Sequence, residues 1–189
     1  MDLINQIPAN IMAEPKPFSP VKLISGIIAS KEASFIKAEE RLVQLYGALD
    51  ITSPLFRFNF TDYYEKQMGK NLKRKFLSFA SLTSPEKLGE IKLRTNGLEE
   101  EIRKELKEDR RVVNLDPGYL TQSALIMATT KDFAHRIPLQ QGIYAHLELL
   151  FSKKSIKTLD WTYPDYRTEQ YQKFFMEVRG IYLSQVANL

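Results

Sequence analysis

The chain has 189 residues, a formal net charge of +4, 43% hydrophobic residues and no cysteine. This length and apolar content are typical of one globular domain, and the lack of cysteine excludes a disulfide framework, a thiolate zinc site and a cysteine nucleophile. No apolar run is long enough to cross a membrane and the first residues lack a secretory pattern, so we expect a cytoplasmic protein. The mild positive charge favours an acidic or phosphorylated partner, but it is not typical of a dedicated nucleic-acid binder.

The first third of the chain predicts an arm, a strand and a helix. Four prolines predict an extended or disordered arm over residues 1–20. The apolar run 21–29 predicts a buried strand. A helix should follow, because apolar residues recur at helical spacing between Ser30, which can cap the helix, and Gly47, which can end it.

The middle of the chain predicts two strands, a helix and a further strand. Residues 55–60 alternate between apolar and polar, and another strand should begin near Lys73. Ser84 can cap a helix that has Pro85 at its first position, and residues 112–115 predict the next strand. The order βαββαβ is that of the ferredoxin-like unit.

The last third predicts a short helix at 121–128, a hairpin of strands 133–139 and 143–151, and a final helix capped by Thr168. We therefore expect a single α+β domain over residues 21–189. It would have a ferredoxin-like βαββαβ core, an added C-terminal hairpin and a final helix.

A turn is predicted at Asp116-Pro117-Gly118, because proline fixes φ at the second position and glycine supplies a positive φ at the third. At the end of a strand, Asn114 and Asp116 would be placed to bind an anion beside backbone N–H groups, or a hard divalent cation through the carboxylate. Turn chemistry alone accounts for the same residue types, so both explanations stay open.

The densest polar cluster contains Lys131, Asp132, His135 and Arg136. His135 is a candidate general base or acid, and the other three are candidate ligand contacts. On a strand, Asp132 and Arg136 would face one side and Lys131 and His135 the other. An exposed strand start with local ion pairs is the simpler explanation.

The register of the predicted hairpin decides which histidine can face a pocket. A two-residue turn would put His135 opposite Glu148, whereas a three-residue turn would put Arg136 opposite His146. The sequence does not choose between them, because a one-residue slip exchanges the two faces of a strand.

Two further segments contain candidate ligand contacts. In the basic stretch 61–75, Tyr64, Lys73 and Arg74 could hold a phosphate and stack a base, although lysine runs are commonly solvated strand edges. The aromatic loop that ends at Arg167 could form a pocket wall with a cation for an anionic group, or it could only cover the sheet.

Several common sites are absent from the sequence. It contains no GxGxxG, GxxxxGK[ST], HExxH or GxSxG motif. With two histidines and no cysteine, an ordinary zinc site would need carboxylates.

The segments KRKFLSF, SPEKLGEIKL, VVNLDPGYL, ATTKDFAHRI and WTYPDYR resemble an uncharacterised family of small bacterial and archaeal proteins, known only as a domain of unknown function. The likeness runs from about Pro20 to the C-terminus, and NLDPGY and TKDFAHR are its most specific parts. It implies a prokaryotic cytosolic protein and supplies no activity. The strand order is also similar to that of the two-histidine phosphoesterases, but His135-Arg136-Ile137 and His146-Leu147-Glu148 do not match their His-x-Thr/Ser motifs, so we reject that chemistry.

The sequence thus favours a small cytosolic protein that binds an anionic or phosphorylated small ligand, and it leaves open whether the protein is an enzyme. Arg136 and Lys73 would hold the anion, and His135 or Asp116 would move a proton, with a divalent cation as a further option. The alternatives are a non-catalytic interaction or scaffold protein and, less favoured, an RNA-binding protein. The oligomeric state is not indicated.

Overall fold

The structure is a computed structural model that describes residues 14–61 and 63–188. Its strands are β1 (Val21–Ala29), β2 (Leu49–Thr52), β3 (Phe56–Arg57), β4 (Lys73–Thr83), β5 (Val113–Leu120), β6 (Ala124–Thr129), β7 (Ile137–Gln140), β8 (Ile143–Phe151) and β9 (Ile156–Thr158). Its helices are α1 (Glu32–Tyr46), α2 (Glu65–Met68), α3 (Leu88–Glu105) and α4 (Glu169–Val186). The class is therefore α+β, as predicted.

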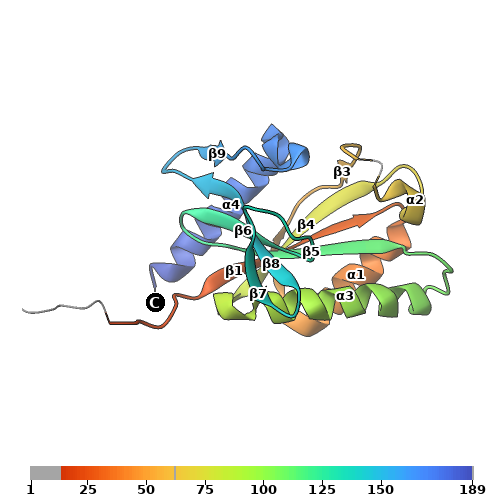
Figure 1. Cartoon of the computed structure of the whole chain (residues 1–189), viewed down its shortest axis with the longest axis horizontal. Coiled ribbons are helices and arrows are strands. Elements are labelled where there is room, and N and C mark those ends of the chain that lie inside the picture. Colours follow the sequence, from red (N-terminus) through yellow and green to blue (C-terminus); the bar gives the residue numbers. More distant parts are fainter. Residues whose placement is uncertain (1–13, 62, 189) are drawn as a thin grey trace, which may run out of the picture.

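The nine strands of the described residues form one sheet, in the order β2-β4-β1-β5-β6-β8-β7, with β3 beside β4 and β9 beside β8. Every pairing is antiparallel. Helices α1 and α3 lie along one face, and α4 covers the other (Figure 1). Two helical layers are needed because the sheet carries apolar side chains on both faces.

The central strand β1 explains this arrangement, since it is buried along its whole length. Successive side chains of a strand point to opposite faces. Leu23 and Ile27 therefore pack with α1 and α3, while Ile24 packs with α4. A strand covered on both faces is a largely apolar run rather than an alternating one, and Lys22 and Ser25 are the polar side chains buried in β1.

The strand at 21–29, the strand from Lys73 and the three long helices are confirmed. Ser84 caps as predicted, because its Oγ accepts a hydrogen bond from the backbone N–H of Glu86. The prediction for Ser30 is wrong: Lys31 occupies the N-cap position, and the Ser30 hydroxyl donates to the carbonyl of Met68 at 3.0 Å. Of the predicted arm, residues 1–13 lie outside the described residues, and 14–20 form neither helix nor strand.

Three other predictions are wrong in type or extent. The strand expected at 55–60 is only the two-residue β3, and the sheet is extended instead by β2. The helix expected at 121–128 is strand β6. A short apolar run such as ALIMAT has no period that separates a buried strand from a helix.

The turn expected at Asp116-Pro117-Gly118 is also wrong, because all three residues lie inside β5. Pro117 pairs with Ser25 of β1, while β6 joins β5 only from Gly118 onward. Proline has no N–H to donate to a neighbouring strand. It is tolerated here because β6 does not pair with β5 at residue 117.

The hairpin of β7 and β8 exists, but β7 starts at Ile137 rather than at residue 133. Gln140 pairs with Ile143, so the turn has two residues, Gln141-Gly142, with φ of 47° and 75°. Positive φ at both positions is typical of a type I′ turn. The two-residue turn is thus one of the two predicted alternatives, but a register shift occurs between Pro138 and Gln140. Because of this shift, His135 does not come to lie opposite Glu148 as that alternative predicted.

The sheet divides between β5 and β6. The two strands pair over only three residues, from Gly118–Met127 to Leu120–Leu125. Beyond this point β5 continues along β1, whereas β6 continues along β8. Beyond this division, Asn114 and Asp116 of β5 and Met127, Ala128 and Thr129 of β6 line the candidate site.

Candidate functional site

A cavity of about 580 Å³ lies at the division between β5 and β6. Its walls combine aromatic rings with polar side chains from segments that are far apart in the sequence. The charged and imidazole groups of the lining are Arg74, Lys92, Glu99, Arg111, Asp116, Lys131, His146, Glu148 and Asp165. Convergence of such groups in one concave site is what a ligand-binding pocket requires.

Arg74 of β4 is the most buried cation of the cavity, with 6% of its side chain exposed. One guanidinium nitrogen donates to Asp116 Oδ2 at 2.6 Å, and the other donates to Asp165 Oδ2. Its guanidinium carbon lies 5.0 to 5.5 Å from the ring centres of Phe58, Phe76 and Tyr166. Arg74 therefore ties two strands and the turn before α4 together through charged contacts.

Asp116 lies between two cations. Lys92 Nζ is 3.7 Å from Asp116 Oδ1, and it also donates to the carbonyl of Leu115 at 2.7 Å. Burial raises the pKa of the Asp116 carboxyl, but Lys92 and Arg74 outweigh that effect, so the pKa lies below its ordinary value. Burial has the larger effect on Asp165, whose pKa is raised although Arg74 opposes the rise.

Arg111 holds the next part of the wall. It donates to Glu99 Oε2 at 2.6 Å and to Asn114 Oδ1 at 2.6 Å. The other oxygen of Glu99 accepts the backbone N–H of Leu115 at 2.7 Å. Burial raises the pKa of Glu99, with Arg111 opposing the rise.

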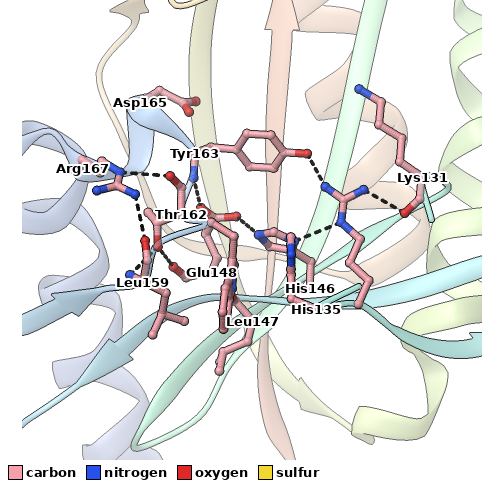
Figure 2. A network of polar contacts seen from close by, with 12 residues as sticks. Lys131, His135, His146, Leu147, Glu148, Leu159, Thr162, Tyr163, Asp165 and Arg167 are labelled. Atoms are coloured by element: carbon pink, nitrogen blue, oxygen red, sulfur yellow. Dashed lines mark hydrogen bonds and ion pairs between the residues drawn. The ribbon is translucent and has the colours of Figure 1, made fainter. Parts of the chain in front are cut away.

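The pair His146 and Glu148 comes from β8, and the two side chains are 1% and 0% exposed. Glu148 Oε2 lies 2.9 Å from His146 Nε2, although the angles are not those of a well-aligned hydrogen bond. Glu148 Oε1 accepts the backbone N–H of Tyr163 at 2.7 Å. Figure 2 shows Glu148 between the imidazole of His146 and the backbone of Tyr163.

The loop before β7 contacts the other side of His146. His146 Nδ1 lies 3.1 Å from His135 Nε2 and 3.2 Å from Arg136 Nε. His135 stacks on Trp161 with ring centres 4.8 Å apart. Burial, His146 and Arg136 together lower the pKa of His135.

Half of the predicted site residues line this cavity. Asn114, Asp116, Arg74, Tyr64 and Lys131 do so, the last with its Nζ 4.2 Å from the ring centre of Tyr63. Lys131 to Arg136 is not the strand start that the sequence suggested, because β7 begins after it. The cavity thus brings together residues of three predicted segments: the basic stretch 61–75, the segment with Asn114 and Asp116, and Lys131 from the polar cluster.

The other predicted residues lie elsewhere. Lys73 and Asp132 are exposed and outside the cavity lining. Arg167 donates to the carbonyls of Thr162 and Leu159, at 3.0 and 2.8 Å, so it holds the aromatic loop together. His135 and Arg136 contact His146 from behind the lining.

The sequence interpretation missed Lys92, Glu99, Arg111, Tyr163 and Asp165 as site residues. A signal existed for two of them. Lys92 and Glu99 are seven residues apart on α3, which places them on one stripe beside the apolar stripe of the helix. A polar stripe so close to the buried face indicates groups that point into the protein.

Residues 14–61 and 63–188 contain no group of three or more His, Asp or Glu side chains that could hold a metal ion. None of their helices is long and apolar enough to cross a membrane.

These features define the class as an α+β protein with one antiparallel sheet and a polar cavity where the sheet divides. Residues 19–182 match a family described as a domain of unknown function, DUF4416, and the chain belongs to this family. The resemblance seen in the sequence is thereby confirmed. None of the curated proteins and none of the solved structures matches the chain.

Proposed function

We propose that the cavity binds a small molecule that carries an anionic group, such as a phosphate. The observation that carries this proposal is the convergence of Arg74, Lys92, Arg111 and Lys131 on one cavity from four separate segments. Cations that line a concave, partly desolvated site concentrate anionic ligands. An interaction protein would not need this convergence.

Three of the four carboxylates that line the cavity contact an arginine, and the fourth, Glu148, lies 2.9 Å from His146 Nε2 and accepts the backbone N–H of Tyr163. Asp116 and Asp165 contact Arg74, and Glu99 contacts Arg111. Lys131, which is exposed, forms no ion pair with the described residues and lies over the ring of Tyr63. Lys131 can therefore contact an incoming anion without first breaking an ion pair.

Aromatic side chains form much of the remaining wall. Phe60, Tyr63, Tyr64 and Tyr163 all line the cavity. Flat rings beside a cationic group suit a ligand with a planar or apolar part attached to its anionic group.

A thermal-shift screen tests the proposal. The panel holds inorganic phosphate, sulfate, sugar phosphates and nucleotides, added to metal-stripped protein. A ligand at 100 times its Kd stabilises the native state by roughly 2.7 kcal/mol, which corresponds to a rise in Tm of roughly 5–11 °C for a chain of this size.

Matched variants locate the binding site. We expect Lys131→Gln to weaken binding about tenfold or more, because a hydrogen bond to a charged group contributes about 1.5–3 kcal/mol. Lys73→Gln removes the same charge outside the cavity and should leave the affinity within about twofold of the wild type. The proposal fails if no anion raises the Tm, or if the two variants weaken binding equally.

A protein-interaction role remains the second candidate, and one observation favours it. Phe133, Ile137 and Leu139 expose 64%, 67% and 44% of their surface around β7, which lies at the edge of the sheet. Apolar side chains grouped at an edge are typical of a docking surface. RNA binding is weaker, because Arg74 of the predicted basic stretch is buried in ion pairs.

The ferredoxin-like assignment and the cytoplasmic location remain part of the proposal. The partial order β2-β4-β1-β5, with α1 and α3 on one face, supports a ferredoxin-like core. The lack of cysteine fits a reducing compartment. A divalent cation stays a further option, which the same thermal-shift measurement tests when divalent cations are added to the metal-stripped protein.

A further inference from the structure

The imidazole of His146 is held in one tautomer. Arg136 Nε lies 3.2 Å from His146 Nδ1 and donates to it. A guanidinium is always protonated in a protein, so Nδ1 must offer its lone pair. The ring proton then lies on Nε2, which is the atom 2.9 Å from Glu148 Oε2.

Few other charges face His146. Glu148 of β8 lies on its Nε2 side, while His135 and Arg136 lie on its Nδ1 side. The ring of Tyr163 stacks on the imidazole with centres 5.3 Å apart, and β6 contributes Met127, which does not titrate. Among the described neighbours of His146, Arg136 is thus the one permanently charged cation, and its positive charge disfavours a second proton on the imidazole.

The other contacts of Arg136 are to neutral acceptors. Its NH1 group donates to the carbonyl of Lys131 at 2.8 Å, and its NH2 group donates to the hydroxyl of Tyr163 at 2.8 Å. Both of these residues line the cavity. An anion bound beside them would compete for the guanidinium, because hydrogen bonds between two charged groups are about twice as strong as neutral ones.

We propose that an anion bound in the cavity draws Arg136 away from His146, and that His146 then takes up one proton on Nδ1 from solvent. This inference rests on the proposed function for the anion. The imidazolium would be stabilised by the carboxylate of Glu148 on its Nε2 side. On its Nδ1 side, it would donate to Nε2 of His135. For this, neutral His135 must change tautomer by exchange with solvent, so that its single ring proton moves from Nε2 to Nδ1.

His135 suits this acceptor role. Burial lowers its pKa, and so does the neighbouring His146, which favours the neutral ring that can accept a proton. It is also half-buried rather than enclosed, which gives the proton a short path from water. The cavity would then hold an imidazolium beside the anion, which is the arrangement that a general acid needs.

The first arm of the test needs no ligand. The chain has only two histidines, so ¹⁵N NMR of the imidazole nitrogens assigns both. In the wild type at pH 8 we expect the proton of His146 on Nε2. In Arg136→Met, we expect His146 to take up its second proton at a pH about one unit higher, the size of effect that a neighbouring charge produces.

Two results in this arm overturn the inference: a His146 proton on Nδ1 in the wild type, or an unchanged His146 titration in Arg136→Met. Arg110→Met is the matched control, because Arg110 is exposed and outside the lining of the cavity. Arg136→Gln replaces the Met variant if that protein does not fold, as judged from the dispersion of its amide spectrum.

The second arm uses sulfate, which does not titrate near neutral pH. Calorimetry in buffers of different ionisation enthalpy counts the protons taken up for each sulfate bound. We expect about one proton near pH 7 in the wild type and none in His146→Gln. Sulfate binding without proton uptake overturns the inference and leaves the proposed function standing. If neither sulfate nor any other anion of the thermal-shift panel binds, the proposed function and the coupling are overturned together.

Discussion

Arg74 gives the sharpest prediction on stability. Its guanidinium is almost fully buried and forms ion pairs with both Asp116 and Asp165. In Arg74→Met the methionine fills much of the same volume, so the main loss is the charge. Removing one member of a buried charge pair costs about 3–5 kcal/mol, because the remaining charge is left without compensation.

For a chain of this size, that loss lowers Tm by roughly 6–20 °C, since each kcal/mol corresponds to about 2–4 °C. Urea and thermal unfolding followed by circular dichroism measure both quantities. Lys73→Met is the matched control, because Lys73 is the exposed neighbour of Arg74 on β4, and we expect it to stay within about 0.5 kcal/mol of the wild type.

The double variant Arg74→Met, Asp165→Asn identifies the cause. If uncompensated carboxylates produce the loss, neutralising Asp165 must restore part of the stability, and its own pKa is already raised by burial. A loss under about 1 kcal/mol in Arg74→Met, or a double variant less stable than the single one, would refute this reasoning.

Two further predictions concern the strands that divide. Gly118→Ala would place a Cβ 2.5 Å from Met127 Sδ and 2.6 Å from the carbonyl oxygen of Ile126, so we expect urea unfolding to show a loss of about 1–3 kcal/mol. Gly180→Ala on α4 meets nothing within 4 Å and should be neutral or stabilising, as helix propensity requires. Because the folded-state pKa of Asp116 is lowered, its ionisation stabilises the fold above its unfolded pKa of about 4, and this contribution is lost as the pH falls through the folded value. Asp116→Asn should therefore flatten the acid limb of stability measured against pH, and an unchanged limb would contradict the assignment.

Regular apolar periodicity accounts for what the sequence could predict. β1 is a largely apolar run, and the long helices have apolar residues at helical spacing. These patterns predict the type and position of the elements. β5 was cut short because Asp116-Pro117-Gly118 has the composition of a turn. In the fold, Gly118 serves a different purpose, since its missing Cβ lets β6 approach closely. Glycine is typical both of a turn and of a strand position where another strand approaches closely. A single sequence does not show which of the two explanations applies to Gly118.

The candidate site was harder to predict because its residues meet only through the tertiary fold. Asp116 and Lys131 were found as local clusters of polar residues, but Lys92 of α3 has an ordinary place in a charged helix. Its role follows from its distance to Asp116, which depends on where β5 and β6 divide. The hairpin shows the same limit. The two-residue turn is one of two alternatives that the sequence allows, and the register shift at Pro138–Gln140 has no signal in the turn residues.

The division of the sheet explains why a polar cavity exists in the centre of this fold. A continuous sheet would separate the α1/α3 face from the α4 face, and Lys92 of α3 could not meet Asp116 on the α4 side. Because β6 leaves β5 after three pairs, side chains from both faces reach one space, including Lys92 from one side and Asp165 from the other. The charges that meet there are expensive to bury unless they pair, and Arg74 and Arg111 supply those pairs. Lys131 lines this space, and Arg136 reaches it only through its hydrogen bonds to two lining residues, Lys131 and Tyr163. Neither cation has a carboxylate partner in the described part of the chain, so both can turn toward an anion in the cavity without breaking an ion pair.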